Sequence, residues 1–391
     1  MFVTRKRILF IVAMALILCG VAAAAPANTA APVGTQVSAK NNPYGLPKEL
    51  FNLWNSLTLE EKIGQMIMVY MAPPNFTVKN NFGGILVMKP HLSNLNLYER
   101  NLGKITSRIK VPPLVTIDQE GGGVNRISNI DRKWTNTPSA KEMREMEPEA
   151  ITNVARDIGK TLHDAGFNLN LAPTLDPASN IYGKETFMEH WNRSWGGIEN
   201  IEKARAFVKG MKASGIISAA KHFPGYDSET NSDLQMAESD ATEEKIRKNV
   251  APFKALAPDA PVIMMSSVRY TKISDAPAVF EPKIVKMAHD IDDDIVVLTD
   301  DLWGTNLRAW ISGPEAPLPN PYPASEFKKV VKAALDAGND MFMTTYPTKA
   351  VDMKNTLLEL ARQSDDYLVR IEKSVARILK MKFRAGLLTS H

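Results

Sequence analysis

The prediction of the fold starts from the stretch Lys221-His222-Phe223-Pro224-Gly225 and the polar loop behind it, Tyr226 to Gln235. The run before this stretch, Gly215 to Ala220, is apolar and partly β-branched and has the length of a buried strand. From Thr242 onward the pattern is helical. Polar side chains just past the carboxyl end of a strand are typical of the functional face of an α/β barrel. For this stretch alone, a solvated surface loop with a structural His222 is the simpler interpretation.

Other short apolar runs along the chain also have the length of buried strands, and segments of helical length separate them. The additional strand candidates are 66–70, 84–88, 114–118, 168–175, 262–266, 295–299 and 341–345. The helix-compatible segments are 94–109, 138–165, 198–213, 242–256, 281–290, 325–337, 348–362 and 365–383. Thr58-Leu-Glu-Glu61 has capping-box spacing, which predicts the start of an earlier helix.

This alternation predicts an α/β fold, a single (β/α)8 TIM-like barrel. A doubly wound open sheet is the alternative. No Gly-x-Gly-x-x-Gly fingerprint follows an early strand, so a dinucleotide-binding fold gains no support.

The first 25 residues are typical of a secretory signal peptide, with Arg5, Lys6 and Arg7 before an apolar stretch and a small-residue cleavage zone at 21–25. We therefore expect a periplasmic or secreted protein; an uncleaved membrane anchor is the alternative. Leu18 before Cys19 does not favour lipidation. Residues 26–46 have the composition of a flexible tether, which leaves 47–391 as the barrel domain.

Composition excludes several kinds of partner. Removing Arg5, Lys6 and Arg7 takes the formal charge from +4 to +1, and no basic tract remains that would indicate nucleic-acid binding. The single cysteine, Cys19, is lost with the signal peptide, so the fold cannot depend on disulfides. The six histidines show no ligand spacing, so we predict no metal and no other cofactor. We expect a monomer without stable membrane insertion after cleavage.

In a barrel, the polar residues that follow each strand meet at one mouth. Asp300 and Asp301 directly follow an apolar run, and a pair of aspartates there is costly unless something uses or neutralises it, although one of the two could be structural. The other polar residues in such positions are Asp118, Arg126, Asp176, Arg193, Lys221, His222, Ser266 and Ser267.

This residue set fits a ligand rich in hydroxyl groups, with carboxylate, guanidinium, ammonium and imidazole groups as hydrogen-bond partners. Trp303 or Trp195 could stack on a sugar ring. Hydrolysis of a glycosidic bond needs one nucleophile or base and one proton donor on opposite sides of the anomeric carbon. No Gly-x-Ser-x-Gly elbow supports a serine hydrolase.

Several motifs resemble those of the family 3 glycoside hydrolases, and within them the single-domain β-N-acetylglucosaminidases (β-N-acetylhexosaminidases) of bacterial cell-wall turnover. The matching stretches begin at Glu60, Gly83, Ile117, Leu171, Asn192, Lys221 and Leu298, and read EEKIGQM, GGIL, IDQEGG, LAPTLD, NRSWG, KHFPG and LTDDL. The resemblance implies an exported retaining glycosidase that removes terminal β-linked N-acetylglucosamine, with peptidoglycan fragments as the expected source.

The resemblance also implies roles for individual residues. Asp300 takes the place of the nucleophile that forms a covalent glycosyl-enzyme, and Asp176 that of a structural residue. The substrate hydroxyls would be held by Asp118, Arg126, Arg193, Lys221 and His222.

The loop after the KHFPG motif departs from the family pattern. Relatives end this loop with Asp-Ser-His, whose histidine is the acid/base, whereas this chain has Asn231-Ser232-Asp233, one residue earlier. Asp233 would then be the acid/base, if burial raises its pKa. Gly123 replaces a family arginine and Ser267 a family histidine. A catalytically impaired member that binds glycan or a protein partner is the second hypothesis.

Overall fold

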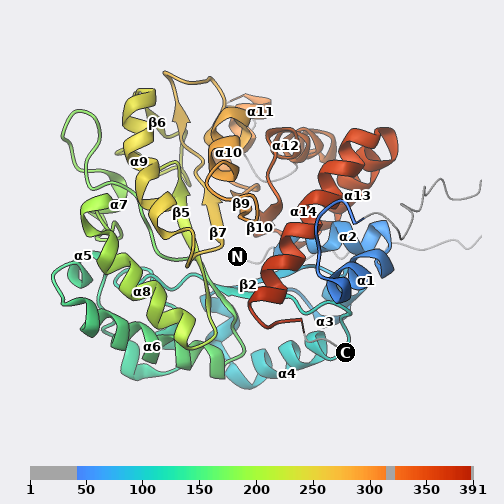
Figure 1. Ribbon diagram of the computed structural model, residues 1–391, viewed down its shortest axis with the longest axis horizontal. Coiled ribbons are helices and arrows are strands. Elements are labelled where there is room, and N and C mark those ends of the chain that lie inside the picture. Colours follow the sequence, from blue (N-terminus) through green and yellow to red (C-terminus); the bar gives the residue numbers. More distant parts are fainter. Residues whose placement is uncertain (1–41, 314–321, 389–391) are drawn as a thin grey trace, which may run out of the picture. The chain divides into compact units, whose positions relative to one another are not determined.

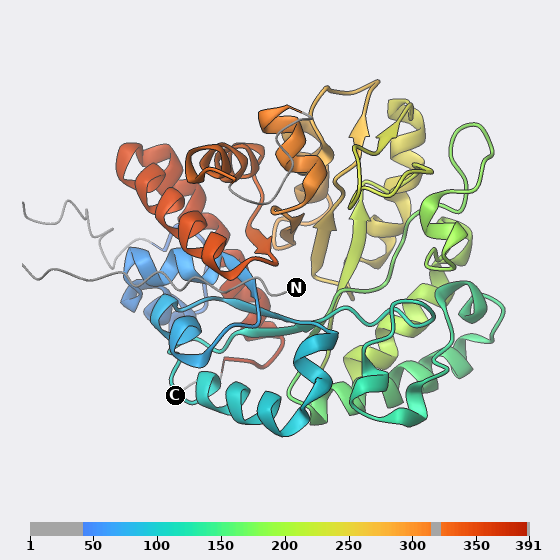
Figure 2. The same ribbon diagram turned by 180° about the vertical axis from the view of Figure 1, so that it is seen from behind.

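The computed structural model describes residues 42–313 and 322–388 and shows a closed barrel of parallel strands (Figures 1 and 2). Going around the barrel, the strand order is β1-β10-β9-β7-β5-β4-β3-β2, which confirms the predicted TIM-like barrel and excludes the open sheet. The strands are β1 Ile67–Tyr70, β2 Gly84–Val87, β3 Leu114–Ile117, β4 Leu169–Asn170, β5 Ile217–Phe223, β7 Val262–Met265, β9 Val296–Asp301 and β10 Met341–Thr344.

Three strands end more than one residue away from the predicted position, and one of them is β9, which continues through Asp301 and so contains Asp300 and Asp301. β4 is only two residues long, and Pro173, which has no amide hydrogen, lies in the remainder of the predicted run. β5 continues through Phe223, so Lys221 and His222 belong to the strand itself and do not follow it. Outside the barrel, β6 Glu238–Ser239 and β8 Arg269–Tyr270 form a small separate sheet.

Helices surround the barrel and cover its outer face (Figures 1 and 2). Thr58 caps α2 with the predicted capping box. The predicted segment 138–165 is divided, because Pro148 starts a new helix at a position where it needs no donor. The α-helices are α1 Lys48–Ser56, α2 Leu59–Gln65, α3 Pro74–Asn80, α4 Leu95–Thr106, α5 Ala140–Met143, α6 Pro148–Asp164, α7 Phe187–His190, α8 Ile201–Ala213, α9 Glu243–Leu256, α10 Pro282–His289, α11 Thr305–Ser312, α12 Ala324–Ala337, α13 Pro347–Gln363 and α14 Asp365–Arg384. Short 3-10 helices are η1 Lys89–Ser93, η2 Ile127–Asn129, η3 Arg132–Trp134, η4 Ile198–Asn200 and η5 Ala278–Phe280.

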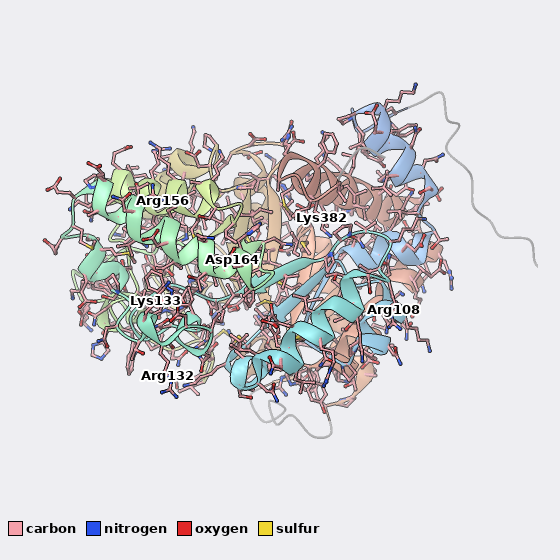
Figure 3. The ribbon with its side chains drawn as sticks, turned by 90° about the horizontal axis from the view of Figure 1, so that it is seen from below. Arg108, Arg132, Lys133, Arg156, Asp164 and Lys382 are labelled. Atoms are coloured by element: carbon pink, nitrogen blue, oxygen red, sulfur yellow. The ribbon has the colours of Figure 1, made fainter. Side chains whose placement is uncertain are left out.

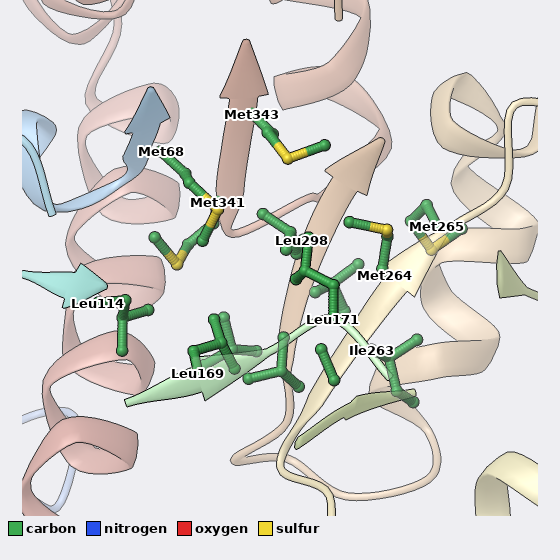
Figure 4. Packing of buried hydrophobic residues seen from close by; sticks show 14 of the residues in the cluster. Met68, Leu114, Leu169, Leu171, Ile263, Met264, Met265, Leu298, Met341 and Met343 are labelled. Atoms are coloured by element: carbon green, nitrogen blue, oxygen red, sulfur yellow. The ribbon is translucent and has the colours of Figure 1, made fainter. Parts of the chain in front are cut away.

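Methionine and leucine side chains from neighbouring strands pack together in the barrel core. Figure 4 shows Met343, Leu298 and Met264 gathered between β10, β9 and β7, and all three are buried. Removing such apolar surface from water is the main favourable contribution to folding. Most strand residues are apolar and buried, as expected for a parallel sheet covered by helices.

A buried lysine connects the last helix to the amino-terminal part of the barrel through hydrogen bonds. Lys382 of α14, labelled in Figure 3, is fully buried. Its ammonium donates to Gln65 Oε1 at 2.8 Å, Gly83 O at 3.0 Å and Pro112 O at 2.8 Å. Each of its three donors therefore has an oxygen acceptor, which offsets the cost of burying the charge.

The barrel is irregular at two places, and both carry predicted site residues. Between Ala220 and Phe223, β5 has one residue more than β7 opposite it, and between Leu298 and Asp301, β9 has one residue more than β10. Such bulges change the direction of side chains. They occur where Lys221-His222 and Asp300 stand, so irregular pairing contributes to the geometry of the mouth.

Within the described residues, no helix is long and apolar enough to cross a membrane. The predicted signal peptide, 1–25, lies outside the described residues. Of the predicted tether, 26–46, the structure describes only 42–46, where Leu46 is buried and the ring of Tyr44 contacts that of Trp54.

Candidate active site

Four charged side chains form a compact network at the carboxyl ends of β3 and β5. Lys221 Nζ lies 2.5 Å from Asp118 Oδ1 and 2.5 Å from Glu120 Oε1. Arg193 forms a bidentate pair with Glu120, with Nε to Oε2 and Nη2 to Oε1 both 2.8 Å. Two positive and two negative groups are thus arranged so that each has an opposite charge beside it.

Glu120 is the centre of this network, although the sequence did not single it out. Burial alone would raise its pKa, but the adjacent Arg193 and Lys221 outweigh burial and hold the pKa well below its usual range. Burial acts to lower the pKa of Lys221. The negative charges of Asp118 and Glu120 outweigh burial, so the pKa lies above its usual value. Glu120 and Lys221 therefore stay charged at neutral pH. The signal that could have identified Glu120 is its place in Asp118-Gln-Glu-Gly-Gly, two residues after Asp118.

His222 is held by Asp176, which is completely buried. His222 Nδ1 lies 2.7 Å from Asp176 Oδ2, and Asp176 Oδ1 accepts hydrogen bonds from the backbone amides of His222 (3.0 Å) and Tyr226 (2.7 Å). This arrangement fixes the imidazole plane and leaves the opposite ring nitrogen, Nε2, for another partner. It also connects the strand end to the loop that carries Asp233.

Asp300 is oriented by two hydrogen bonds. Ser267 Oγ donates to Asp300 Oδ2 at 3.1 Å, and the amide of Asp301 donates to Asp300 Oδ1 at 2.8 Å. The neighbouring Asp301 serves the backbone, because it accepts from the amides of Trp303 (2.9 Å) and Thr345 (3.1 Å) and from the Thr345 hydroxyl. Burial raises the pKa of Asp301 to about 6 despite these bonds.

Asp233 and Asp300 line one pocket of about 350 Å³ at the barrel mouth. Asp233 is exposed, but nearby protein atoms partly desolvate its carboxyl, and this effect together with the charge of Asp300 raises its pKa. Asn231 Oδ1 accepts from the Asp233 amide at 3.0 Å, so this side chain holds the loop backbone. Tyr226 Oη fixes the same loop through Thr230 O and the Ser232 amide.

Arg126 lies on the glycine-rich turn that follows β3. Gln119 Oε1 accepts from the amides of Arg126 (2.7 Å) and Ile127 (2.9 Å) and shapes the turn. Gly121 has φ +93°, and a Cβ there would come within 2.0 Å of Pro138 O, so no other residue fits. The buried Nε of Arg126 has no hydrogen-bond partner among the described residues.

The two tryptophans proposed to stack on a sugar lie in other surroundings. Trp195 is only 2% exposed and packs against Phe207, so its ring is not accessible to a ligand and that prediction is wrong. Trp303 does line the pocket, but Tyr346 stacks on it with ring centroids 5.1 Å apart, and Arg308 lies over the same ring.

A second cavity of about 430 Å³ lies where β5, β7 and β9 begin, at the opposite end of the barrel from Asp300. Its lining includes Ile217, Pro261 and Ile295. Active sites of this fold lie at the carboxyl end of the strands, so the smaller pocket is the better candidate. In the part of the chain that the structure describes, no group of three or more His, Cys, Asp or Glu side chains is arranged to hold a metal ion.

Comparisons with known proteins agree with this geometry. Residues 58–381 match the family described as "Glycosyl hydrolase family 3 N terminal domain". Beta-hexosaminidase A of Pseudoalteromonas piscicida is 30% identical over 179 residues, which are 44% of this chain and only 30% of that protein. Beta-hexosaminidase LpqI of Mycobacterium tuberculosis is 23% identical over 378 residues, covering 91% of this chain and 89% of the relative.

A solved structure gives the same result. The β-N-acetylhexosaminidase of Beutenbergia cavernae superposes with a TM-score of 0.70 and 25% identity, over 84% of this chain and 99% of that structure. The family match spans nearly all of the barrel domain. The chain therefore belongs to glycosyl hydrolase family 3 and is a glycoside hydrolase of the β-hexosaminidase type.

Proposed function

We propose that the protein is an exported retaining glycosidase that removes terminal β-linked N-acetylglucosamine, with peptidoglycan fragments as its source of substrate. The observation that carries this proposal is that Asp233 and Asp300 line one pocket at the barrel mouth. Two carboxyl groups facing one sugar-sized space are what a double displacement requires.

In the first step, an oxygen of Asp300 attacks the anomeric carbon, and the glycosidic bond to the leaving-group oxygen breaks. The Ser267 hydroxyl and the Asp301 amide keep the attacking carboxylate in one orientation. Asp233 gives its proton to the leaving oxygen. In the second step, water attacks the same carbon, its proton passes to Asp233, and the carboxylate of Asp300 is released.

The charge of Asp300 helps Asp233 to serve first as an acid and then as a base. Partial desolvation and the negative charge of Asp300 raise the pKa of Asp233 in the free enzyme, which favours the protonated acid. Once Asp300 is esterified, its charge is gone, so the pKa of Asp233 falls and the ionised base is favoured.

The charged network would form the subsite for the terminal sugar. Asp118, Arg193 and Lys221 already neutralise one another together with Glu120, so they offer hydrogen bonds to hydroxyl groups without net charge. Arg126, which is half-buried, and His222 would add further donors, His222 through the imidazole held by Asp176.

The test is hydrolysis of 4-nitrophenyl N-acetyl-β-glucosaminide by the purified protein. Asp300→Asn should abolish release of nitrophenol, and a fluorinated N-acetylglucosamine derivative that traps the glycosyl-enzyme should label the peptide containing Asp300 in mass spectrometry. Label on another carboxylate would refute the assigned nucleophile. Export is tested separately, by locating the protein in cell fractions with and without residues 1–25.

A catalytically impaired member that binds glycan is the second candidate, and the exposure of Asp233 favours it. Water stabilises the ionised form of an exposed carboxyl, and an ionised carboxyl cannot donate a proton. A wild-type protein that is inactive on a panel of aryl glycosides, yet binds N-acetylglucosamine in calorimetry, would support this second function over hydrolysis.

A further inference from the structure

The carboxyl group of Asp233 forms no hydrogen bond with any described residue; the one hydrogen bond of Asp233 is from its amide to Asn231 Oδ1. The carboxyl group of Asp300, by contrast, is oriented by Ser267 and by the Asp301 amide. The position of Asp233 therefore depends on the backbone of its loop, residues 224–237, which runs from β5 to β6 (Figure 1). A proton donor must lie within hydrogen-bond reach of the leaving-group oxygen, so the contacts that hold this backbone decide how well Asp233 can act.

The hydroxyl group of Tyr226 connects the two backbone groups on either side of Asn231. It donates to Thr230 O and accepts from the Ser232 amide at 2.8 Å. Burial raises the pKa of this hydroxyl, so it stays protonated at neutral pH and can fill both roles. Ser232 is itself buried, so Tyr226 fixes the backbone one residue before the acid.

Residues 231–235 form a small hydrogen-bonded turn with Asp233 inside it. Asn231 O accepts from the amides of Leu234 (3.2 Å) and Gln235 (3.3 Å), and Asn231 Oδ1 accepts from that of Asp233. The bond from Ser232 to Tyr226 is the one hydrogen bond that connects this turn to the rest of the described protein. Tyr226 is therefore the point at which the turn is attached to the barrel.

Tyr226 is itself held in place, and by the same carboxylate that holds His222. Its ring is only 2% exposed and packs edge-on against the imidazole of His222 with ring centroids 5.9 Å apart. Its amide donates to Asp176 Oδ1 at 2.7 Å, while Asp176 Oδ2 lies 2.7 Å from His222 Nδ1. The loop that carries Asp233 is thus fixed relative to a residue of the proposed sugar subsite.

We propose that Tyr226 is a positioning residue for Asp233, and that its hydroxyl holds the turn in which the carboxyl meets the leaving-group oxygen. The inference rests on the proposed role of Asp233 as the acid/base. Tyr226 acts through the loop and not on the substrate. Without its hydroxyl, the turn would let the carboxyl spread over many positions, of which few allow proton transfer. This role also explains how a carboxyl without a hydrogen bond of its own can act as a catalyst.

The experiment measures kcat/KM of wild type and Tyr226→Phe on phenyl and 4-nitrophenyl N-acetyl-β-glucosaminide, which differ only in the nitro group. This parameter reports the steps up to loss of the leaving group. Nitrophenolate leaves with little protonation, whereas phenolate needs the acid. Tyr226→Phe should therefore slow the phenyl substrate roughly 10- to 100-fold, as expected for a catalytic group displaced by about 1 Å, and leave the nitrophenyl rate close to that of wild type.

Tyr98→Phe is the matched control. Tyr98 is also a buried tyrosine, and its hydroxyl donates to a backbone carbonyl outside the mouth, Ala165 O at 3.0 Å. This variant should leave both rates unchanged. In an Asp233→Asn background, Tyr226→Phe should cause no further loss on the phenyl substrate, because no acid remains to be positioned.

Amide hydrogen exchange of the peptide covering residues 227–236 gives a readout independent of hydrolysis. Exchange should be faster in Tyr226→Phe than in wild type and Tyr98→Phe, since the Ser232 amide loses its acceptor. Unchanged exchange would overturn the inference, as would an equal loss on both substrates, no loss on the phenyl substrate, or a further loss in the Asp233→Asn background. A wild type that cleaves neither substrate, combined with faster exchange in Tyr226→Phe, would instead refute the proposed hydrolysis while retaining the attachment of the loop by Tyr226.

Discussion

Replacing Glu120 by Gln tests whether the charged network holds the mouth together. Glu120 is almost inaccessible to solvent and bridges Lys221 and Arg193. The substitution keeps the shape of the side chain but removes one negative charge, so two buried cations are left with Asp118 alone. Breaking a buried ion pair by removing one partner typically costs about 3–5 kcal/mol, and we expect a loss of that order in the free energy of unfolding.

The assay is urea unfolding followed by fluorescence, together with kcat/KM for the nitrophenyl glycoside. Asp259→Asn is the matched control, because Asp259 also bridges an arginine and a lysine, Arg205 at 3.2 Å and Lys212 at 3.2 Å. Asp259 is 21% exposed and Lys212 is 62% exposed, so this substitution should cost on the order of 1 kcal/mol and leave kcat/KM unchanged. An equal loss of stability in the two variants would refute the reasoning from burial.

The same variant has a predictable pH dependence. The pKa of Glu120 is lower in the folded state than in the unfolded chain. The unfolded state therefore takes up a proton first as pH falls, and the stability that Glu120 contributes is present above its unfolded pKa of about 4.3 and is lost below it. The difference between wild type and Glu120→Gln should be largest near neutral pH and shrink below about pH 4. A difference that stays constant over this range would contradict the linkage argument.

Three further substitutions test other parts of the molecule. Ser267→Ala removes one of the two hydrogen bonds to Asp300 and should lower kcat roughly tenfold, whereas Ser267→Thr should keep most activity; equal rates would show that the bond is dispensable. Because the acid must be protonated, the rate of cleavage of a natural disaccharide should fall as pH rises through the raised pKa of Asp233. Asp233→Asn should remove this decrease with pH and leave hydrolysis of the nitrophenyl substrate largely intact. Equal effects on both substrates would rule out the acid role. Lys382→Met leaves Gln65 Oε1 and Pro112 O without a donor, whereas Gly83 O keeps its hydrogen bond from the Leu114 amide, and the variant should lose about 3 kcal/mol of stability in urea unfolding. Lys380→Met, which breaks a partly exposed pair with Asp294, should cost under about 1 kcal/mol; similar losses would contradict the role of Lys382.

The barrel could be predicted because each strand is a short apolar run, and because the helices between the strands show a different periodicity. The residues at which the strands end at the barrel mouth were harder to predict. Lys221 and His222 belong to β5, but their polarity ends the apolar run at Ala220, so the sequence places them in a loop. Short α11 was missed for a related reason: it begins after Gly304, which offers no side-chain cap, and so lacks a start signal.

Roles that depend on three-dimensional neighbours could not be predicted from residue type. Glu120 and Asp118 are both carboxylates in one motif, and only the approach of Arg193 from a distant segment shows that Glu120 is the buried centre. Trp195 is an aromatic residue beside Arg193, as a stacking residue would be, but its ring faces α8. Arg308 has the appearance of an ordinary helix-surface residue until its burial and its unpartnered nitrogen are known.

The two sides of the barrel mouth differ in net charge, and this difference suggests how a substrate is oriented. On the β3 and β5 side, Asp118, Glu120, Lys221 and Arg193 neutralise one another, so a neutral sugar can be bound there through hydrogen bonds alone. On the β9 side, the carboxyl groups of Asp233, Asp300 and Asp301 outnumber the single guanidinium of Arg308 on α11. Under the proposed double displacement, the terminal sugar would be held by the neutral network on the β3 and β5 side, and the bond to be broken would lie between this subsite and the carboxyl groups of Asp233 and Asp300. A subsite without net charge would bind the neutral sugar without adding to the repulsion between the carboxylates of the pocket.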